Sequence, residues 1–424
     1  MSRFQFLVAL ACVALSACSR SAPVSQTRST DDKGTSTAGQ DSSTGGGSGD
    51  YVVAAPIQHG NLTIFPVLSK TPRTEDRFMT LEEGLKAKTV EIVEMGAHGA
   101  AGRAAQVAAQ TAESRPESDK VGEGDEAADD DVEIAALLVA GNDVNRLSVI
   151  NRGDKPLYLM PGEIIVGGSQ DRTIGEETVI AATGEPVAID VYCVEHGRWG
   201  GRDIAAYGSI LGGLDDDRDD DESEAAAANR GKFVAKAGTL SKSSSLAVQA
   251  AEGQGKVWEE VATANSASGA KWASGAFTAN YVDPDVVKKL RPYIDALTRP
   301  VSDHEQVVGI VVAINGKIET VDVFESTPLF RKLWPQLLKS FALDALQSED
   351  ADDEESKTIV AQTDAQEFLA KILHDQPGEN RKTEGGLVVS RHETKDAISF
   401  SAGGMMGGMG GGMAAPVHAA GFAK

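Results

Sequence analysis

The densest group of chemically capable side chains lies in residues 193–199, which read CVEHGRW. A thiol, a carboxylate, an imidazole and a guanidinium so close together would suit a nucleophile or a metal site. A structural zinc site, however, usually needs four ligands in two spaced pairs, and the second pair is missing here. Cys193 also continues an alternating apolar face, which favours a buried core thiol over a catalytic or metal-ligating one. The aliphatic members of that face are Val187, Ile189 and Val191.

A second polar group lies in residues 167–172, GGSQDR. Paired glycines can present successive N–H groups to an anion, but no nucleotide-binding spacing accompanies them. A simple turn and a ligand site therefore both stay open. Glu163 and Glu195 could also serve acid–base chemistry if the fold brought them together. The candidate ligand-binding residues are Glu163, Gln170, Asp171, Arg172, Glu195, His196, Arg198 and Trp199. No metal ligand and no cofactor is assigned.

Short apolar runs bounded by Gly, Pro and Asp must position these groups, and such runs are typical of strands and turns. The sequence predicts strands over residues 62–68, 90–94, 132–139 and 144–151. Between the first two, Thr80 begins a short helix as its N-cap, with acids in the first turn. Residues 187–193 supply the strand that leads to His196, which we expect to face solvent.

The second half of the chain predicts one hairpin and several helices. Asn315-Gly316 readily supplies a type I′ turn, and apolar residues on both faces predict a central place in the sheet. Helices are expected at about 254–261, from Pro284, after Ser326 and at 364–374, with a further hairpin at 386–400. We expect Pro292 to kink or end its helix and Pro335 to break the next one. The predicted fold class is α+β, with a β-rich core of antiparallel strands and hairpins and several C-terminal helices.

The N-terminus predicts an exported, lipid-anchored protein. Arg3 precedes a short apolar run, and residues 15–18 read LSAC, which resembles a bacterial lipobox. Cys18 would then be lipidated, and Ser19 after it resembles sorting to the outer membrane, at its periplasmic face. The expected partners are the membrane, through this anchor, and an unidentified small molecule or envelope protein.

Composition divides the chain into a folded part and low-complexity parts. We expect a signal peptide at 1–18, a flexible tether at 19–50, a domain at 51–400 and a disordered Gly/Met-rich tail at 401–424. Acidic insertions are expected at about 97–131 and 215–230, because low hydrophobicity with high charge cannot repay ordering entropy. The net charge of -23 argues against a nucleic-acid partner, since phosphate binding requires clustered Lys and Arg.

The two polar groups belong to a longer pattern that resembles a known domain family. Residues 151–156 (NRGDKP), 162–163, 167–172 and 193–199, followed by 311–317 (VVAINGK) and 329–335 (LFRKLWP), resemble the ARPP-1 type, the ARG and rhodanese-phosphatase-superfamily-associated protein domain. The resemblance covers about 51–345. It implies a link to ADP-ribosylglycohydrolases and rhodanese-phosphatase proteins, but it implies no catalytic residues.

Two functions are consistent with this sequence. The first is a non-enzymatic ligand-binding or protein-interaction domain on a cell-envelope lipoprotein. The second is a hydrolase or other enzyme that acts on a nucleotide, an ADP-ribose-related molecule or another small polar substrate. Convergence of the candidate residues in a concave pocket would favour the enzyme, and a shallow surface would favour the binding domain.

Overall fold

The computed structural model describes residues 48–95, 145–197, 231–348, 360–374, 378–383, 386–404 and 416–424, which belong to one compact unit. The predicted signal peptide with Cys18, the tether up to residue 47, the acidic insertions, the predicted strand over 132–139, and Arg198 and Trp199 lie outside the described residues. Residues 48–50, which we assigned to the tether, instead form the short helix η1 (Ser48–Asp50). None of the described helices has the length and apolar character that a membrane span requires.

The largest element is a nine-stranded sheet whose neighbouring strands are all antiparallel. Its order is β1-β3-β13-β14-β18-β17-β16-β15, and β2 pairs with β3 beside β1. The strands are β1 (Tyr51–Val53), β2 (Ile57–His59), β3 (Leu62–Ser69), β13 (Val307–Ile314), β14 (Lys317–Phe324), β15 (Glu379–Lys382), β16 (Leu387–Glu393), β17 (Ala397–Gly404) and β18 (His418–Ala423). Asn315 and Gly316 both have positive φ, at 49° and 72°, so the predicted hairpin and its central position are confirmed.

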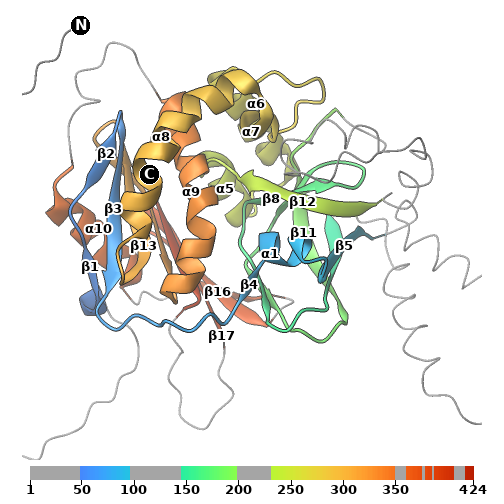
Figure 1. The fold of residues 1–424 in the computed structure, drawn as a ribbon, viewed down its shortest axis with the longest axis horizontal. Helices are drawn as coiled ribbons and strands as arrows, with labels where there is room; N and C mark the ends of the chain where they lie inside the picture. Colours follow the sequence, from blue (N-terminus) through green and yellow to red (C-terminus); the bar gives the residue numbers. More distant parts are fainter. Residues whose placement is uncertain are drawn as a thin grey trace, which may run out of the picture. The chain divides into compact units, whose positions relative to one another are not determined.

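Both faces of this sheet are covered by helices. On one face, Leu62, Ile64 and Ile310 share a core with helices α8 (Pro284–Ser302) and α9 (Thr327–Gln347). On the other face, Phe65 and Val311 pack with α10 (Gln362–Leu373). Figure 1 shows α8 and α9 in front of β3 and β13. A strand that is buried on both faces has no solvent-exposed side for polar residues. This explains the uninterrupted apolar run in β13.

The two proline-containing helices are continuous, which corrects our prediction that Pro335 breaks its helix. Pro292 lies within α8, which it does not end, and Pro335 lies within α9. A proline inside a helix costs about 3 kcal/mol through a lost hydrogen bond and a clash. In α9 the residues on both sides of Pro335 are buried in one core, Trp334 before it and Leu337 after it. Tertiary packing therefore outweighs the local cost.

The chain end departs most clearly from expectation. We predicted a disordered tail over 401–424. Residues 405–415 lie outside the described residues, but β17 continues to Gly404 and β18 pairs with both β14 and β17 in the interior of the sheet. Gly421 makes this possible, because a Cβ there would lie 2.6 Å from Ile372 of α10. Small residues that look uninformative in the sequence allow β18 to fit beneath that helix.

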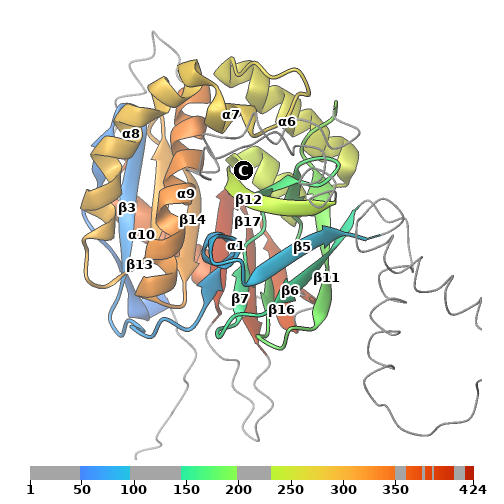
Figure 2. The same cartoon turned by 45° about the vertical axis from the view of Figure 1, so that its right-hand side comes forward.

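The polar sequence groups belong to a second, smaller substructure, a closed barrel. Its strand order is β11-β6-β5-β12-β8-β9, and Figure 2 shows β5, β6, β11 and β12 together. The strands are β5 (Val90–Glu94), β6 (Arg146–Asn151), β8 (Glu163–Gly167), β9 (Arg172–Ile174), β11 (Pro186–Cys193) and β12 (Lys232–Thr239). Aliphatic side chains such as Leu147, Ile165, Ile174 and Val191 form its core. A small sheet of β4 (Met79–Thr80), β7 (Leu157–Leu159) and β10 (Thr178–Ile180) adjoins it.

The remaining described helices are α1 (Leu81–Lys86), α5 (Lys242–Gln249), α6 (Gln254–Ser268) and α7 (Ala279–Val282). Helix α1 contacts β5 and β12 of the barrel, and α6 contacts β11. Thr80 caps α1 as predicted: Glu83 N donates to Thr80 Oγ1 at 3.4 Å, and Thr80 N donates to Glu83 Oε2 at 2.8 Å. The fold is therefore α+β, as the sequence predicts.

Candidate functional site

The two polar groups of the sequence meet at one end of the barrel. Strand β9 begins at Arg172 and β11 ends at Cys193, and these two residues are direct partners in the antiparallel pairing. Gln170, Asp171, Arg172 and Glu195 are all buried, with exposed fractions between 0% and 3%. The pairing register thus joins segments that lie more than twenty residues apart in the sequence.

The two carboxylates of this group hold a neighbouring loop against the barrel. Glu195 Oε2 accepts from Asp171 N at 3.0 Å, and Glu195 Oε1 accepts from the Ser274 hydroxyl. Asp171 Oδ2 accepts from Thr278 Oγ1 at 2.9 Å. Sequence reasoning missed Ser274 and Thr278, because nothing in their local pattern indicates a distant carboxylate. These contacts are typical of carboxylates that fix the backbone.

Arg172 is different, because its charge has little to contact. Its Nη1 donates to Gln170 Oε1 at 3.1 Å. Within the described part of the chain, Nε has no hydrogen-bond partner and the guanidinium makes no ion pair. The residue is only 3% exposed. Removing a guanidinium from water costs several kcal/mol unless its donors are satisfied, so among the candidates that the structure describes, Arg172 has a buried donor without a partner.

Cys193 is a core thiol, as its alternating pattern predicts. Its sulfur lies 3.1 Å from Gln170 Oε1 and 3.0 Å from the Glu195 carbonyl oxygen. Gln254 bonds to both its backbone N–H and its carbonyl, each at 2.7 Å. Burial raises the pKa of the thiol, and the nearby Arg172 charge offsets this only in part. The protonated thiol is the weaker nucleophile, so a catalytic role for Cys193 loses support.

The other candidates do not all join this group. His196 is exposed, and its ring lies 4.6 Å from that of Trp258 in an edge arrangement. Glu163 instead forms a fully buried ion pair with Lys236 and accepts from Met160 N at 2.9 Å. The carboxylate pair of Glu163 and Glu195 that we considered is therefore not formed.

The paired glycines do not cradle a ligand, because a side chain of the protein occupies their loop. Gly167 and Gly168 both have positive φ, at 133° and 57°. Gly168 N donates to the Lys232 carbonyl at 2.9 Å, and Ser169 N donates to Glu94 Oε1 at 2.6 Å. The Ser169 hydroxyl donates to the second oxygen of Glu94 at 2.9 Å. Glu94 thus takes the place that an external anion would occupy.

Another buried charge in the described chain has bonds at both ring nitrogens, and nothing in the sequence points to it. His418 of β18 bonds through Nδ1 to Glu177 Oε2 and through Nε2 to Asp322 Oδ1, both at 3.1 Å. Tyr158 OH donates to Glu177 Oε1 at 2.5 Å. The His418 ring also stacks on Phe324 at 4.3 Å. Burial acts to lower the pKa of His418, but the two carboxylates outweigh it and raise the pKa to about 10.

Comparison with known families agrees with the motifs. Residues 50–406 match ARPP-1, described as the ARG and Rhodanese-Phosphatase-superfamily-associated Protein domain, and the chain belongs to this family. No curated relative and no solved structure matches the chain. Among the described residues, no group of three or more His, Cys, Asp or Glu is arranged to hold a metal ion.

Proposed function

We propose that this protein is a cell-envelope lipoprotein whose ARPP-1 domain is a non-enzymatic binding module for a small anionic ligand. The single observation that supports it is Arg172, a buried guanidinium with an unpartnered Nε at the end of the barrel. Arginine presents five N–H donors in a planar fork that matches carboxylate and phosphate groups. A ligand anion would supply the partner that the described chain does not.

The surroundings of Arg172 support binding over catalysis. The thiol beside it has a raised pKa, which disfavours the thiolate. Asp171 and Glu195 use their oxygens to hold backbone and hydroxyl groups in place. Groups bound in this way cost energy to redirect towards a substrate, so they serve better as a rigid support than as an acid or base.

The envelope location rests on the N-terminal sequence. A lipid on Cys18 followed by a tether over residues 19–47 would hold the domain near the periplasmic face of the outer membrane. Cys18→Ser should move the protein from the membrane fraction to the soluble periplasm. An unchanged membrane fraction would contradict the lipid anchor, and sucrose-gradient separation of inner and outer membranes would test which membrane carries it.

Thermal unfolding of the full-length protein in detergent tests the binding function. We expect at least one of phosphate, sulfate, acetate, AMP and ADP-ribose to raise the unfolding temperature, because ligand binding stabilises the native state by mass action. Arg172→Met should abolish the response. Arg152→Met is the matched control, since Arg152 is exposed and paired with Glu91 at 2.9 Å.

Two outcomes would overturn the proposal. The absence of any shift, or an equal shift in wild type and Arg172→Met, would leave Arg172 as a structural residue only. Consumption of AMP or ADP-ribose during incubation, lost in Arg172→Met, would replace the binding module with a hydrolase. Chromatography of the nucleotide after each melting experiment makes that distinction.

A further inference from the structure

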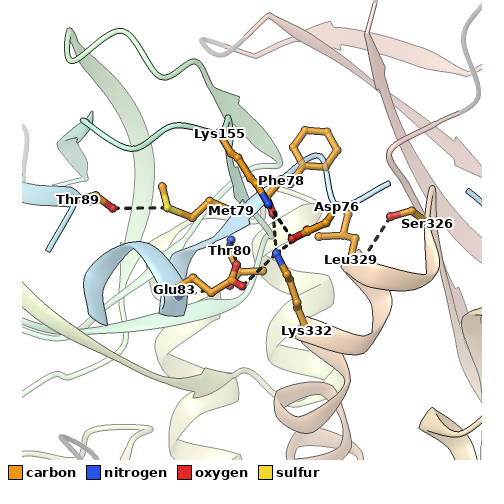
Figure 3. Close-up of polar contacts among 10 residues, drawn as sticks. All are labelled: Asp76, Phe78, Met79, Thr80, Glu83, Thr89, Lys155, Ser326, Leu329 and Lys332. Atoms are coloured by element: carbon orange, nitrogen blue, oxygen red, sulfur yellow. Dashed lines mark hydrogen bonds and ion pairs between the residues drawn. The ribbon is translucent and has the colours of Figure 1, made fainter. Parts of the chain in front are cut away.

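Helix α9 presents three polar side chains towards α1, at positions 332, 336 and 339. This spacing places them on one side of the helix. Lys332 is fully engaged: it bonds to Asp76 Oδ1 at 2.6 Å, Glu83 Oε1 at 3.0 Å and the Phe78 carbonyl at 2.9 Å. Figure 3 shows Lys332 reaching from α9 to this segment beside α1. The first of the three positions is therefore a closed ionic contact.

Lys339, two turns further along α9, has no such contact. Within the described chain its amine forms no hydrogen bond and no ion pair, although the residue is partly buried. Burial lowers the pKa of Lys339. The Glu82 carboxylate of α1 opposes this shift, and the Lys236 ammonium of β12 adds to it. Lys236 is itself fully buried against Glu163 of β8.

Gln336 lies between the two lysines in the sequence and has an acceptor oxygen without a donor among the described residues. Its side chain is 9% exposed and its Oε1 has no hydrogen-bond donor in the described chain. Its Nε2 lies 3.4 Å from Glu82 Oε2, at the long limit of a hydrogen bond. The unpartnered Gln336 oxygen thus lies on the same side of α9 as the unpaired Lys339 amine, three residues further on, and Glu82 contacts the Gln336 amide and acts on the Lys339 charge. A buried acceptor such as Gln336 Oε1 is rarely left without a donor unless a ligand or water completes it.

We propose that Lys339, Gln336 and Glu82 form a second site, in which the Lys339 amine condenses with the carbonyl group of a small aldehyde or ketone. A lysine that is desolvated and lies near another cation is a recognised form of activated nucleophile. This site is independent of Arg172 and of the binding function proposed above.

The three groups suffice for the condensation. The lone pair of the neutral Lys339 amine attacks the carbonyl carbon, and the C=O π electrons move to the oxygen. One amine proton passes through Glu82 to that oxygen and gives a carbinolamine, whose hydroxyl can donate to Gln336 Oε1. The second amine proton then passes through Glu82 to the hydroxyl, which leaves as water while the nitrogen lone pair forms the C=N bond. The imine and the released water together contain every atom of the amine and the carbonyl compound. No oxidant or reductant is required.

Reductive trapping tests this site. The full-length protein is incubated at pH 7 with propanal and sodium cyanoborohydride, and propylated lysines are quantified over time by peptide mass spectrometry. We expect Lys339 to react faster than exposed Lys289, since its lowered pKa raises the neutral fraction of the amine at pH 7. Lys332 is the internal control on the same helix and should react most slowly.

Two variants separate the site from general accessibility. Gln336→Leu removes an oxygen that lacks a donor and one long contact from Nε2 to Glu82, so the unfolding temperature should stay close to wild type while labelling of Lys339 falls severalfold. Lys332→Met, which removes the ion-paired lysine, should leave the Lys339 rate within about twofold, well under the tenfold change of one pKa unit. Labelling of Lys339 no faster than Lys289 would overturn the proposal and leave a water molecule as the completing group. Labelling unaffected by Gln336→Leu would exclude that residue from the site.

Discussion

Two of the cations buried in the described chain differ in how completely they are bonded. His418 is clamped between Glu177 and Asp322 and stacked on Phe324. Arg172 has one amide contact and an Nε without a partner. Both are almost inaccessible, at 2% and 3% exposure. Burial alone therefore does not indicate a functional group; the number of bonds that the protein itself supplies separates a structural charge from one that a ligand could complete.

The location of each cation agrees with this difference. His418 connects three parts of the fold, because Glu177 precedes β10 of the small sheet, while Asp322 and His418 lie in β14 and β18 of the large sheet. Arg172 lies at the end of the barrel and connects nothing beyond its own neighbourhood. The first cation holds substructures together, and the second can be removed without separating them.

His418→Ala should have the largest effect. It leaves two buried carboxylates without their cation, so we expect a loss of about 3–5 kcal/mol in the free energy of unfolding. Urea denaturation followed by circular dichroism measures this loss. The control is His304→Ala, in the partly exposed turn before β13, which should change stability by less than about 0.5 kcal/mol. A loss below about 1 kcal/mol for His418→Ala would remove the basis of the comparison.

The pH dependence of stability should report the same cluster. The pKa of His418 is raised from 6.5 to about 10 in the folded protein. Its contribution is therefore fully present below pH 6.5 and is lost as the pH rises through about 10. Between these values the free energy of unfolding should fall by about 1.4 kcal/mol per pH unit from this group. Denaturation curves of wild type and His418→Gln should differ in slope by this amount, and parallel curves would contradict the imidazolium assignment.

Cys193 sharpens the comparison, because it pairs with Arg172 across the strands and its own polar groups are hydrogen-bonded. Cys193→Ser should cost about 1 kcal/mol, since the one hydroxyl proton can be donated either to Gln170 Oε1 or to the Glu195 carbonyl. Cys193→Val should cost a similar amount through altered shape. Native protein should react with a thiol reagent only after denaturant is added. Rapid labelling of the native thiol, with a lost ligand response in Cys193→Val, would make Cys193 the centre of the site.

Arg172→Met should have the smallest effect on stability. An apolar side chain of similar length removes an unpaired buried charge, so stability should stay the same or rise by about 1 kcal/mol. The same denaturation experiment measures it, with Arg152→Met as the exposed control. A loss above about 2 kcal/mol would show that Arg172 is as structural as His418, and that its missing partner is not a ligand.

Much of the local structure could be predicted because it depends on neighbouring residues. The Asn315-Gly316 turn needs two positive φ values that these residues supply, and the Thr80 cap needs only Glu83 three residues later. The alternation that ends at Cys193 identified a buried strand, and the ordered motifs identified the family. Each of these signals is contained within a short segment, where backbone sterics and hydrogen bonding act directly.

Only the tertiary structure decided which polar residues are satisfied. Gln170, Asp171, Arg172 and Glu195 could be named from the sequence, but Ser274 and Thr278 reach them from a distant loop. His418 had no signal at all, because its two carboxylates lie 96 and 241 residues away. Continuous packing likewise kept α9 intact through Pro335. The energy of a buried charge depends on every group within a few ångströms. A turn or a cap leaves a pattern in neighbouring residues, whereas pairing between distant strands leaves none.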